Sequence, residues 1–361
     1  MRASLMIIAA IALVGMGAAQ AGDVVMYNGG PHHTGVYDTE PLRDLTGLSW
    51  KFDAFDDVTG PPLVHDGVVY FGDRSGHFYA VDRATGELRW RKEAGRTANG
   101  PPTILDGVAY WGSGRGHLYA LDAATGAEKW RYEADGGVCY PPLVHDGRAY
   151  ATSHDQHIHV VDIATGALVK RIEGSDGMCC SPSLAGGVAF VSDWGGNVRA
   201  IDAATLEERW CFAAGTKIYH APAIAGGVAY ASSYDSCVYA IDVETGTQKW
   251  RFATDAPVGM EPAVFEGVVY ASNEGSHLYA LDAKTGERLW DVAREGHVWA
   301  RPVIARGVLV HGTGEAAVYA RDARTGEELW RFAPEGRMAC NPTVNDRMVF
   351  FGSGQALYAL H

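Results

Sequence analysis

The chain has 361 residues, of which 47% are hydrophobic, and a formal net charge of −13 at neutral pH. This hydrophobic content is enough for a large core, and the acidic balance argues against a nucleic-acid partner, because phosphate binding needs a basic surface. Six cysteines do not make a disulfide scaffold in a chain of this length, whose core is large enough without one.

The first 21 residues have the pattern of a secretory signal peptide. Arg2 is followed by the apolar stretch 5–16 and by the small-residue cleavage pattern AQA at 19–21. We therefore expect a periplasmic or secreted protein. No later apolar run approaches the roughly 20 residues that a membrane span needs, and no cysteine follows the apolar stretch as a lipidation site.

After a lead-in segment at 22–45, the region 46–361 repeats with a period of 40 residues. "ALDAATGAEKW" at 120–130 and "ALDAKTGERLW" at 280–290 are two copies of the repeated stretch. In the first complete repeat, the stretches 61–67, 68–73, 77–82 and 87–90 read as four short strands, because alternating apolar residues are bounded by Gly and Asp. Eight equally spaced prolines mark the first strand of each unit: Pro62, Pro102, Pro142, Pro182, Pro222, Pro262, Pro302 and Pro342.

These repeats predict an all-β, eight-bladed β-propeller with four-stranded blades. In each repeat, Asp and Thr can bond nearby backbone amides, Gly permits a positive φ, and Trp can wedge against the next blade. The chain stops after the third strand of its last repeat, so the segment around Trp50 is expected to complete that blade. Lys170 replaces Trp and Leu206 replaces Gly, so we expect the outer contact of the third blade to be the loosest.

Two neighbouring positions of the repeat contain four of the six cysteines. Just before the first strand, the successive repeats carry Gly60, Gly100, Tyr140, Cys180, His220, Met260, Ala300 and Cys340. Cys139 and Cys179 occupy the preceding position in their repeats. In a closed ring, residues at one repeat position surround the channel, so these side chains are candidates for a shared site.

The signature A-x-D-x-x-T-G-x-x-x-W and the opening "VMYNGGPHHTGVY" at 25–37 resemble the pyrroloquinoline-quinone (PQQ)-type propeller repeat. This resemblance covers about 310 residues of repeats. The family includes quinone-dependent alcohol dehydrogenases, the outer-membrane assembly lipoprotein BamB and other exported propellers. The resemblance implies that the loops before the first strands lie on the face that carries the cofactor funnel.

The first interpretation is a copper site in a cup that these side chains would line at the mouth of the channel. Its ligands would be Cys180, His220, Met260 and Cys340, with Cys139 and Cys179 beside them. Thiolate, imidazole and thioether groups are the donors that copper prefers.

The second interpretation is a PQQ-dependent dehydrogenase with calcium, implied by the resemblance. In those enzymes, a disulfide between two adjacent cysteines forms a ring that lies against the quinone. Cys179 and Cys180 have a similar place in their repeat. Glu261 and Asn341 would take the place of the calcium ligands, Trp194 or Trp299 would stack on the quinone, and Arg301 is a further candidate. The chain is much shorter than those enzymes, and no catalytic aspartate can be placed.

The third interpretation is a non-catalytic periplasmic scaffold, similar to BamB, with buried structural cysteines. A small-molecule, metal or peptide ligand on the loop face and a periplasmic protein partner are both consistent with the sequence, and we expect a monomer. Whether the chain is a copper- or quinone-dependent oxidoreductase stays open at this point. His32 and His33 are expected to be exposed.

Overall fold

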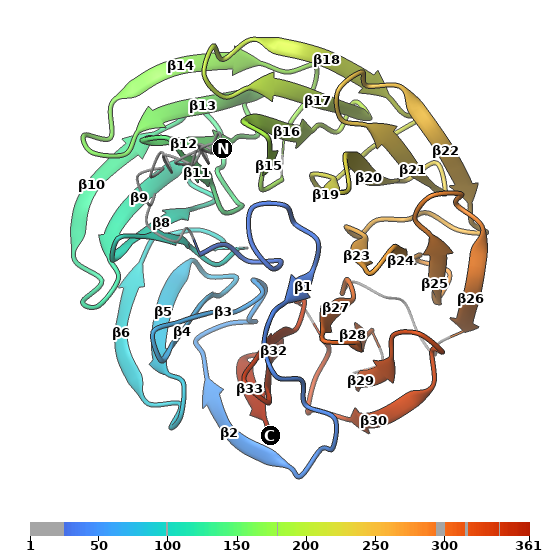
Figure 1. Ribbon diagram of the computed structural model, residues 1–361. Coiled ribbons are helices and arrows are strands. Elements are labelled where there is room, and N and C mark those ends of the chain that lie inside the picture. The colour runs from blue at the N-terminus through green and yellow to red at the C-terminus, as the bar shows by residue number, and fades with distance from the viewer. Residues whose placement is uncertain (1–24, 99, 179, 294–299, 315–316, 339) are drawn as a thin grey trace, which may run out of the picture.

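The computed structural model describes residues 25–98, 100–178, 180–293, 300–314, 317–338 and 340–361. Within these ranges the regular elements are β-strands, and they form eight sheets arranged in a ring (Figure 1). The predicted eight-bladed propeller is therefore confirmed. The predicted signal peptide lies outside the described residues.

Each of the first seven blades is a meander of four consecutive antiparallel strands. The first four blades are β3–β6 (Leu63–His65, Val68–Gly72, His77–Asp82, Leu88–Glu93), β7–β10 (Thr103–Leu105, Val108–Gly112, His117–Asp122, Glu128–Glu133), β11–β14 (Leu143–His145, Arg148–Thr152, His157–Asp162, Leu168–Glu173) and β15–β18 (Ser183–Ala185, Val188–Ser192, Asn197–Asp202, Glu208–Ala213). The next three are β19–β22 (Ala223–Ala225, Val228–Ser233, Cys237–Asp242, Gln248–Ala253), β23–β26 (Ala263–Phe265, Val268–Ser272, His277–Asp282, Arg288–Ala293) and β27–β30 (Val303–Ala305, Val308–Thr313, Ala317–Asp322, Glu328–Phe332). The three-residue first strand of each blade is innermost and contacts the first strands of neighbouring blades.

The eighth blade joins the two ends of the propeller. Its first three strands are β31 (Thr343–Asn345), β32 (Met348–Ser353) and β33 (Ala356–Leu360), and its outer strand is β2 (Leu48–Asp53). β2 pairs antiparallel with β33, so that Trp50 lies opposite Ala359. The predicted closure is confirmed, and this pairing covers the edge that β33 would otherwise expose.

The Asp-x-x-Thr-Gly turn between the third and fourth strands is held by its own side chains. In the first blade, Asp82 Oδ1 accepts hydrogen bonds from the backbone amides of Ala84 (2.9 Å) and Thr85 (3.0 Å). Gly86 has φ +74°, which costs glycine little. Arg89 and these turn contacts hold the pKa of Asp82 at about 2. The sequence interpretation of this turn is thus confirmed.

The repeated tryptophan links each blade to the next one. Trp90 Nε1 donates to the Ala123 carbonyl at 2.9 Å, and its ring lies over Gly126. A Cβ atom at Gly126 would approach that ring to 2.7 Å, so the glycine is needed for space as well as for its positive φ. Trp50, Trp130, Trp210 and Trp250 repeat this bond to a carbonyl of the next blade.

Lys170 and Leu206, which the sequence presents as two separate departures, are the two halves of one contact. Lys170 Nζ donates to the Leu206 carbonyl at 2.7 Å. Lys170 is exposed, whereas the tryptophans at this position of the other described blades are buried or half-buried. Without a ring above it, position 206 has room for a side chain, and Leu206 is 5% exposed although its φ is +61°. That this contact is the loosest stays a prediction.

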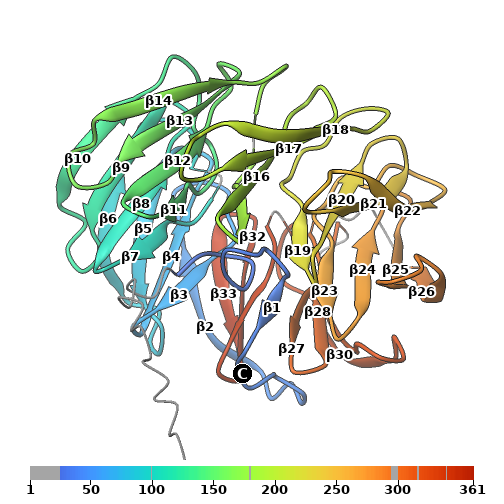
Figure 2. The same ribbon diagram turned by 45° about the horizontal axis from the view of Figure 1, so that its top comes forward.

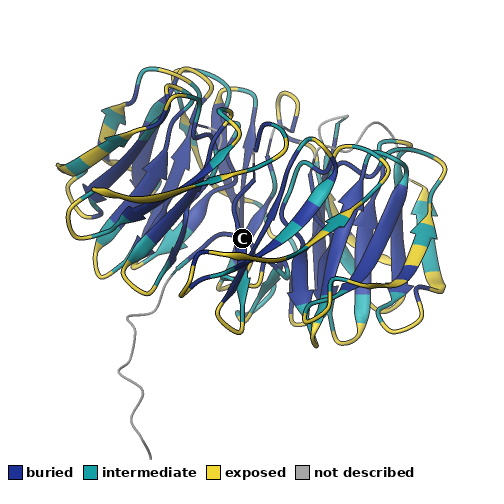
Figure 3. Ribbon diagram, turned by 90° about the horizontal axis from the view of Figure 1, so that it is seen from above, coloured by how far each residue is buried: buried dark blue, intermediate teal, exposed yellow. Residues whose placement is uncertain are grey.

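The core lies between adjacent blades as well as within them. In the first interface, Phe78 of one blade stacks on Trp111 of the next, with ring centroids 4.1 Å apart. Similar clusters of buried residues join the other blades, and burial is concentrated along the inner strands of every sheet (Figure 3). The ring is therefore held by repeated apolar contacts of one kind.

The lead-in segment runs inside the ring, which the sequence did not predict. Val25 pairs with Ile104, and β1 (Val36–Tyr37) pairs in parallel with β27, as a fifth strand of the seventh blade (Figures 1 and 2). Between these points the carbonyls of Pro31, His32 and Thr34 accept hydrogen bonds from the amides of Leu184, Ile224 and Val264. The segment lines a cavity at one mouth of the channel and a smaller one of about 270 Å³, so it lies between the two.

Candidate functional site

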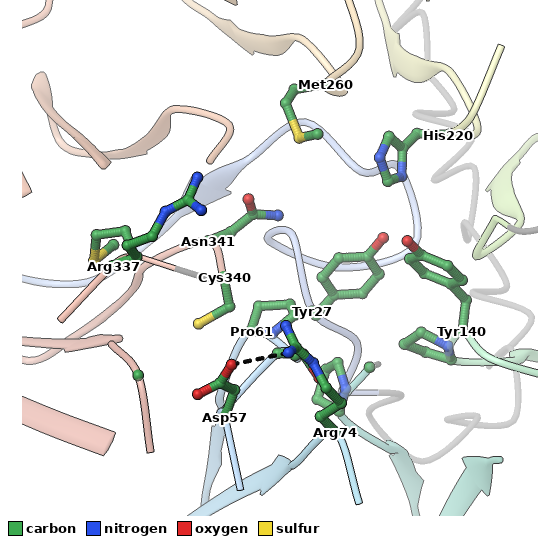
Figure 4. A pocket seen from close by; sticks show the side chains of 16 residues that line it. Tyr27, Asp57, Pro61, Arg74, Tyr140, His220, Met260, Arg337, Cys340 and Asn341 are labelled. Atoms are coloured by element: carbon green, nitrogen blue, oxygen red, sulfur yellow. Dashed lines mark ion pairs between the residues drawn. The ribbon is translucent and has the colours of Figure 1, made fainter. Parts of the chain in front are cut away.

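A cavity of about 620 Å³ lies at the mouth of the central channel. Its walls are the loops that lead into the inner strands of six blades, and Tyr27 of the lead-in segment contributes to its floor (Figure 4). The polar side chains of the lining are Asp57, Thr59, Arg74, His220, Arg337 and Asn341. Prolines, tyrosines and sulfur-containing side chains make up most of the rest.

The polar groups of the cavity differ in how deeply they are buried and in whether they are charged. Arg74 forms an ion pair with Asp57 at 3.1 Å, and both Arg74 and Arg337 are exposed at the rim. His220 lies deeper, with its ring edge to face with Tyr140 at a centroid separation of 5.8 Å. Burial lowers the pKa of His220 despite the opposing effect of Glu261, so its imidazole is neutral near pH 7.

His220, Met260 and Cys340 line this cavity together, whereas Cys180 does not. Cys180 is 1% exposed, and its thiol donates to the Ser192 carbonyl at 3.4 Å. It packs with Met178 in the apolar cluster between the third and fourth blades. Burial raises the pKa of this free thiol to about 12.

The other described cysteines of the predicted cup are also held by protein groups. Cys340 Sγ accepts a hydrogen bond from the Gly352 amide at 3.0 Å, and burial raises its pKa to about 12. Cys139 is 6% exposed and shares a hydrogen bond with His154, which raises the pKa of the imidazole. Cys179 lies outside the described residues.

These surroundings do not fit the predicted copper site. Cys180 lies in the apolar cluster between blades, outside the cavity that His220 and Met260 line. Cys340 Sγ accepts a hydrogen bond from the Gly352 amide. Across the described ranges, no group of three or more His, Cys, Asp or Glu side chains could hold a metal ion. The donors that do share the cavity are one imidazole, one thioether and one thiol, and copper is therefore not supported.

Glu261 and Arg301 form a buried ion pair beside the cavity. Their side chains are 2% and 1% exposed, and Arg301 Nη1 donates to Glu261 Oε2. The lead-in segment supplies two more partners, because Asn28 Nδ2 donates to Oε2 at 2.6 Å and His33 Nδ1 contacts Oε1 at 2.8 Å. Burial alone would raise the pKa of Glu261, but Arg301 and His33 hold it at about 2.

The buried pair does not fit the calcium site that the quinone interpretation requires. Both carboxylate oxygens of Glu261 are occupied by Arg301, Asn28 and His33, and the guanidinium would repel a second cation. The amide oxygen of Asn341 accepts the Arg301 backbone N–H at 2.9 Å. The two oxygen donors expected from the sequence are thus already used within the protein.

Of the two predicted stacking residues, only Trp194 is described, and it lies outside the cavity lining. Trp194 packs against His154, with a centroid distance of 5.3 Å, and against Tyr219 at 6.0 Å. It does not line the cavity, and its buried indole nitrogen has no hydrogen-bond partner in the described part of the chain. Trp299 lies outside the described residues.

The expectation for His33 was wrong. Its side chain is 0% exposed and contacts Glu261, whereas His32 is exposed as expected. Sequence reasoning missed this contact because the two residues are 228 positions apart and the lead-in segment has no repeat partner. The one available signal was the change in residue type at the position after the cup residues, where the successive repeats carry Pro61, Pro101, Pro141, Ser181, Ala221, Glu261, Arg301 and Asn341.

A family model described as outer membrane protein assembly factor BamB matches the chain at residues 44–111, 79–178, 170–292 and 274–361. The chain belongs to this BamB-type propeller family. Its repeats are those of the PQQ-like class that the sequence resembles. No curated protein matches the chain significantly.

Solved structures share the fold at low sequence identity. BamB from Moraxella catarrhalis is 20% identical with a TM-score of 0.74, covering 87% of this chain and 99% of its own. A europium-containing methanol dehydrogenase is 15% identical with a TM-score of 0.79, covering 93% of this chain and 91% of its own. The computationally designed Ika8 protein is 15% identical with a TM-score of 0.78, covering 87% of this chain and 100% of its own. One fold thus occurs in an assembly factor, an enzyme and a designed protein, so function has to be argued from the site.

In the described part of the chain, no helix is long and apolar enough to cross a membrane.

Proposed function

We propose that this protein is an exported propeller that binds a small ligand in the cavity at the mouth of its channel. The observation that carries the proposal is the floor that the lead-in segment provides at Tyr27, which makes the channel mouth a concave pocket. A volume of about 620 Å³ suits a small organic molecule, and the lining combines apolar surface with a few polar groups. Export is inferred from the signal-peptide pattern at 1–21.

This proposal assigns binding and no chemical step. Copper is not carried forward, because Cys180 faces an apolar core and Cys340 Sγ accepts a hydrogen bond from the Gly352 amide. A calcium-assisted quinone is not carried forward either, because Arg301, His33 and Asn28 occupy the carboxylate of Glu261. The cavity itself remains as the candidate binding site.

A scaffold that binds a periplasmic protein is the second candidate. It is favoured by membership of the BamB-type family and by two adjacent exposed apolar residues, Leu168 (44%) and Val169 (47%), on the edge strand β14. Exposed apolar side chains on an unpaired strand edge are suited to a protein contact. The two candidates place binding on different parts of the molecule, one at the channel and the other at the rim.

Native mass spectrometry of protein isolated from the periplasm tests the first candidate. We expect a non-covalent small-molecule adduct on the wild type and its loss in Met260→Trp, which fills the cavity. Val169→Trp is the matched control, because it adds the same ring at the rim, and it should keep the adduct. A wild type without an adduct, or an adduct that survives Met260→Trp and disappears in Val169→Trp, would contradict binding at the channel mouth.

A further inference from the structure

The net charge of the residues that line the cavity is opposite in sign to the net charge of the whole chain. The whole chain carries −13, yet the charged residues that line the cavity are Arg74, Arg337 and a single carboxylate, Asp57. Asp57 is already paired with Arg74 at 3.1 Å, and this is the ion pair drawn among the lining residues in Figure 4. The lining therefore has a net positive charge, supplied by Arg337, in a protein whose surface is acidic overall.

The uncharged polar groups of the cavity include one clear hydrogen-bond donor. Asn341 Oδ1 accepts the Arg301 backbone N–H, which leaves its Nδ2 group as the donor for a ligand. The rings of Tyr27 and Tyr140 lie on the side of the cavity opposite Asn341 and Arg337 (Figure 4). Nδ1 of His220 is buried and has no partner among the described residues.

Arg301 lies behind the lining, where its charge is compensated by the paired carboxylate of Glu261. Its guanidinium lies 5.6 Å from the centre of the Tyr27 ring. Only Nη1 is matched to Glu261, while Nε and Nη2 are buried without a partner in the described part of the chain. The Arg301–Glu261 pair therefore adds hydrogen-bond donors behind the cavity but no net positive charge.

We propose that the ligand of this cavity is an organic acid, with a carboxylate that lies between Arg337 and Asn341 and an apolar, planar body against Tyr27, Tyr140 and Met260. A guanidinium together with an amide N–H donor selects an anionic, acceptor-rich ligand, and a carboxylate offers the strongest charge-assisted hydrogen bonds to such groups. The inference rests on the proposed function and specifies its ligand class. A free small acid and the carboxyl terminus of a peptide share this chemistry.

Titration calorimetry with matched probes tests whether the cavity prefers a negatively charged ligand. We compare 2-naphthoate with 2-naphthamide, which has nearly the same shape without the charge, and acetyl-Gly-Phe with its C-terminal amide. We expect each acid to bind about tenfold or more tightly than its amide, since hydrogen bonds to charged groups contribute roughly 1.5–3 kcal/mol. The preference for the acid should weaken with added salt.

Two variants locate the carboxylate within the cavity. Asn341→Asp keeps the oxygen that accepts the Arg301 N–H but replaces the donor with an acceptor, so it should remove most of the preference for 2-naphthoate over 2-naphthamide. Arg337→Gln, at the exposed rim, should weaken 2-naphthoate binding by about two- to fivefold, as expected for an exposed charge. Arg331→Gln removes an exposed arginine from the outer strand β30 and should change neither affinity.

The outcomes separate this inference from the proposed function. Equal or tighter binding of the amides, or an unchanged preference in Asn341→Asp, overturns the organic-acid inference and leaves ligand binding in place. Failure of both acids to bind also overturns the inference, whereas the adduct measured by native mass spectrometry judges the proposed function separately. If the peptide acid alone binds, the carboxylate is that of a chain terminus.

Discussion

The outer rim and the centre of this propeller are built from the same repeat, but the rim residues recur in nearly every blade whereas the central residues vary. At the rim, the Asp-Thr-Gly turn and the tryptophan recur in nearly every blade and make the same contacts, as at Asp82 and Trp90. At the channel mouth, one repeat position holds Tyr140, Cys180, His220 and Met260 in successive blades. A position that varies so widely among the blades does not meet a structural need common to all of them, so we propose that ligand binding belongs to the centre.

The buried pair at the centre should carry the largest effect on stability. Replacing Arg301 with Ala leaves the buried carboxylate of Glu261 without its main counter-charge, and we expect the free energy of unfolding to fall by about 3–5 kcal/mol. Urea denaturation followed by tryptophan fluorescence measures this loss.

The double variant Glu261→Met/Arg301→Met is the control for this prediction. It removes both charges and should recover much of the loss, because apolar replacement of a buried pair is often close to neutral. A loss in Arg301→Ala below about 1 kcal/mol would mean that water or another group already compensates Glu261.

The tryptophan at the rim should come next. Trp90→Ala removes a ring that is 8% exposed and packs over Gly126, so we expect a loss of about 3 kcal/mol. Lys170→Ala, at the equivalent position of the third blade, should cost less than about 1 kcal/mol, because that side chain is exposed. Equal losses in the two variants would contradict the view that the third contact is the loosest.

The pH dependence of stability should also reveal the contribution of the Glu261–Arg301 ion pair. The pKa of Glu261 is about 2 in the folded protein and 4.5 in the reference state, so its contribution is present above pH 4.5 and is lost as the pH falls toward 2. From about pH 5 to about pH 3 the loss should be about 2 kcal/mol. The Glu261→Gln variant should show a shallower decline in thermal midpoint over this range, and parallel curves would contradict the assignment.

The smallest effect should come from restoring the repeat at the rim. Lys170→Trp alone should not stabilise the protein, because Leu206 occupies the space under the new ring. Lys170→Trp/Leu206→Gly should be more stable than the sum of the single changes predicts, by about 1 kcal/mol. A double-mutant cycle measures this coupling, and additive effects would show that the two departures are independent.

The fold could be predicted from the sequence because the determinants of a propeller repeat at fixed spacing. The 40-residue period placed the turns, the tryptophans and the closure by β2, because these features depend on contacts that recur within each blade or between neighbouring blades. The ring also explains why His220, Met260 and Cys340 come together although they are far apart in the chain.

The chemistry of the centre could not be predicted in the same way, because it depends on which way each side chain turns and on a segment without repeats. Cys180 shares its repeat position with His220, yet it packs into the apolar core between blades. Glu261 has the donor chemistry of a calcium ligand, yet His33 and Asn28 of the lead-in segment satisfy it. Only tertiary pairing of 25–37 with the inner strands reveals these partners.

Amide hydrogen exchange with and without 2-naphthoate tests most directly whether binding takes place at the centre. The account predicts slower exchange in the lead-in segment around Tyr27 and in the loop that ends at Asn341, with no change in the turn at Asp82. Protection confined to the outer strands, or none with the probe at saturation, would contradict a ligand site at the channel mouth.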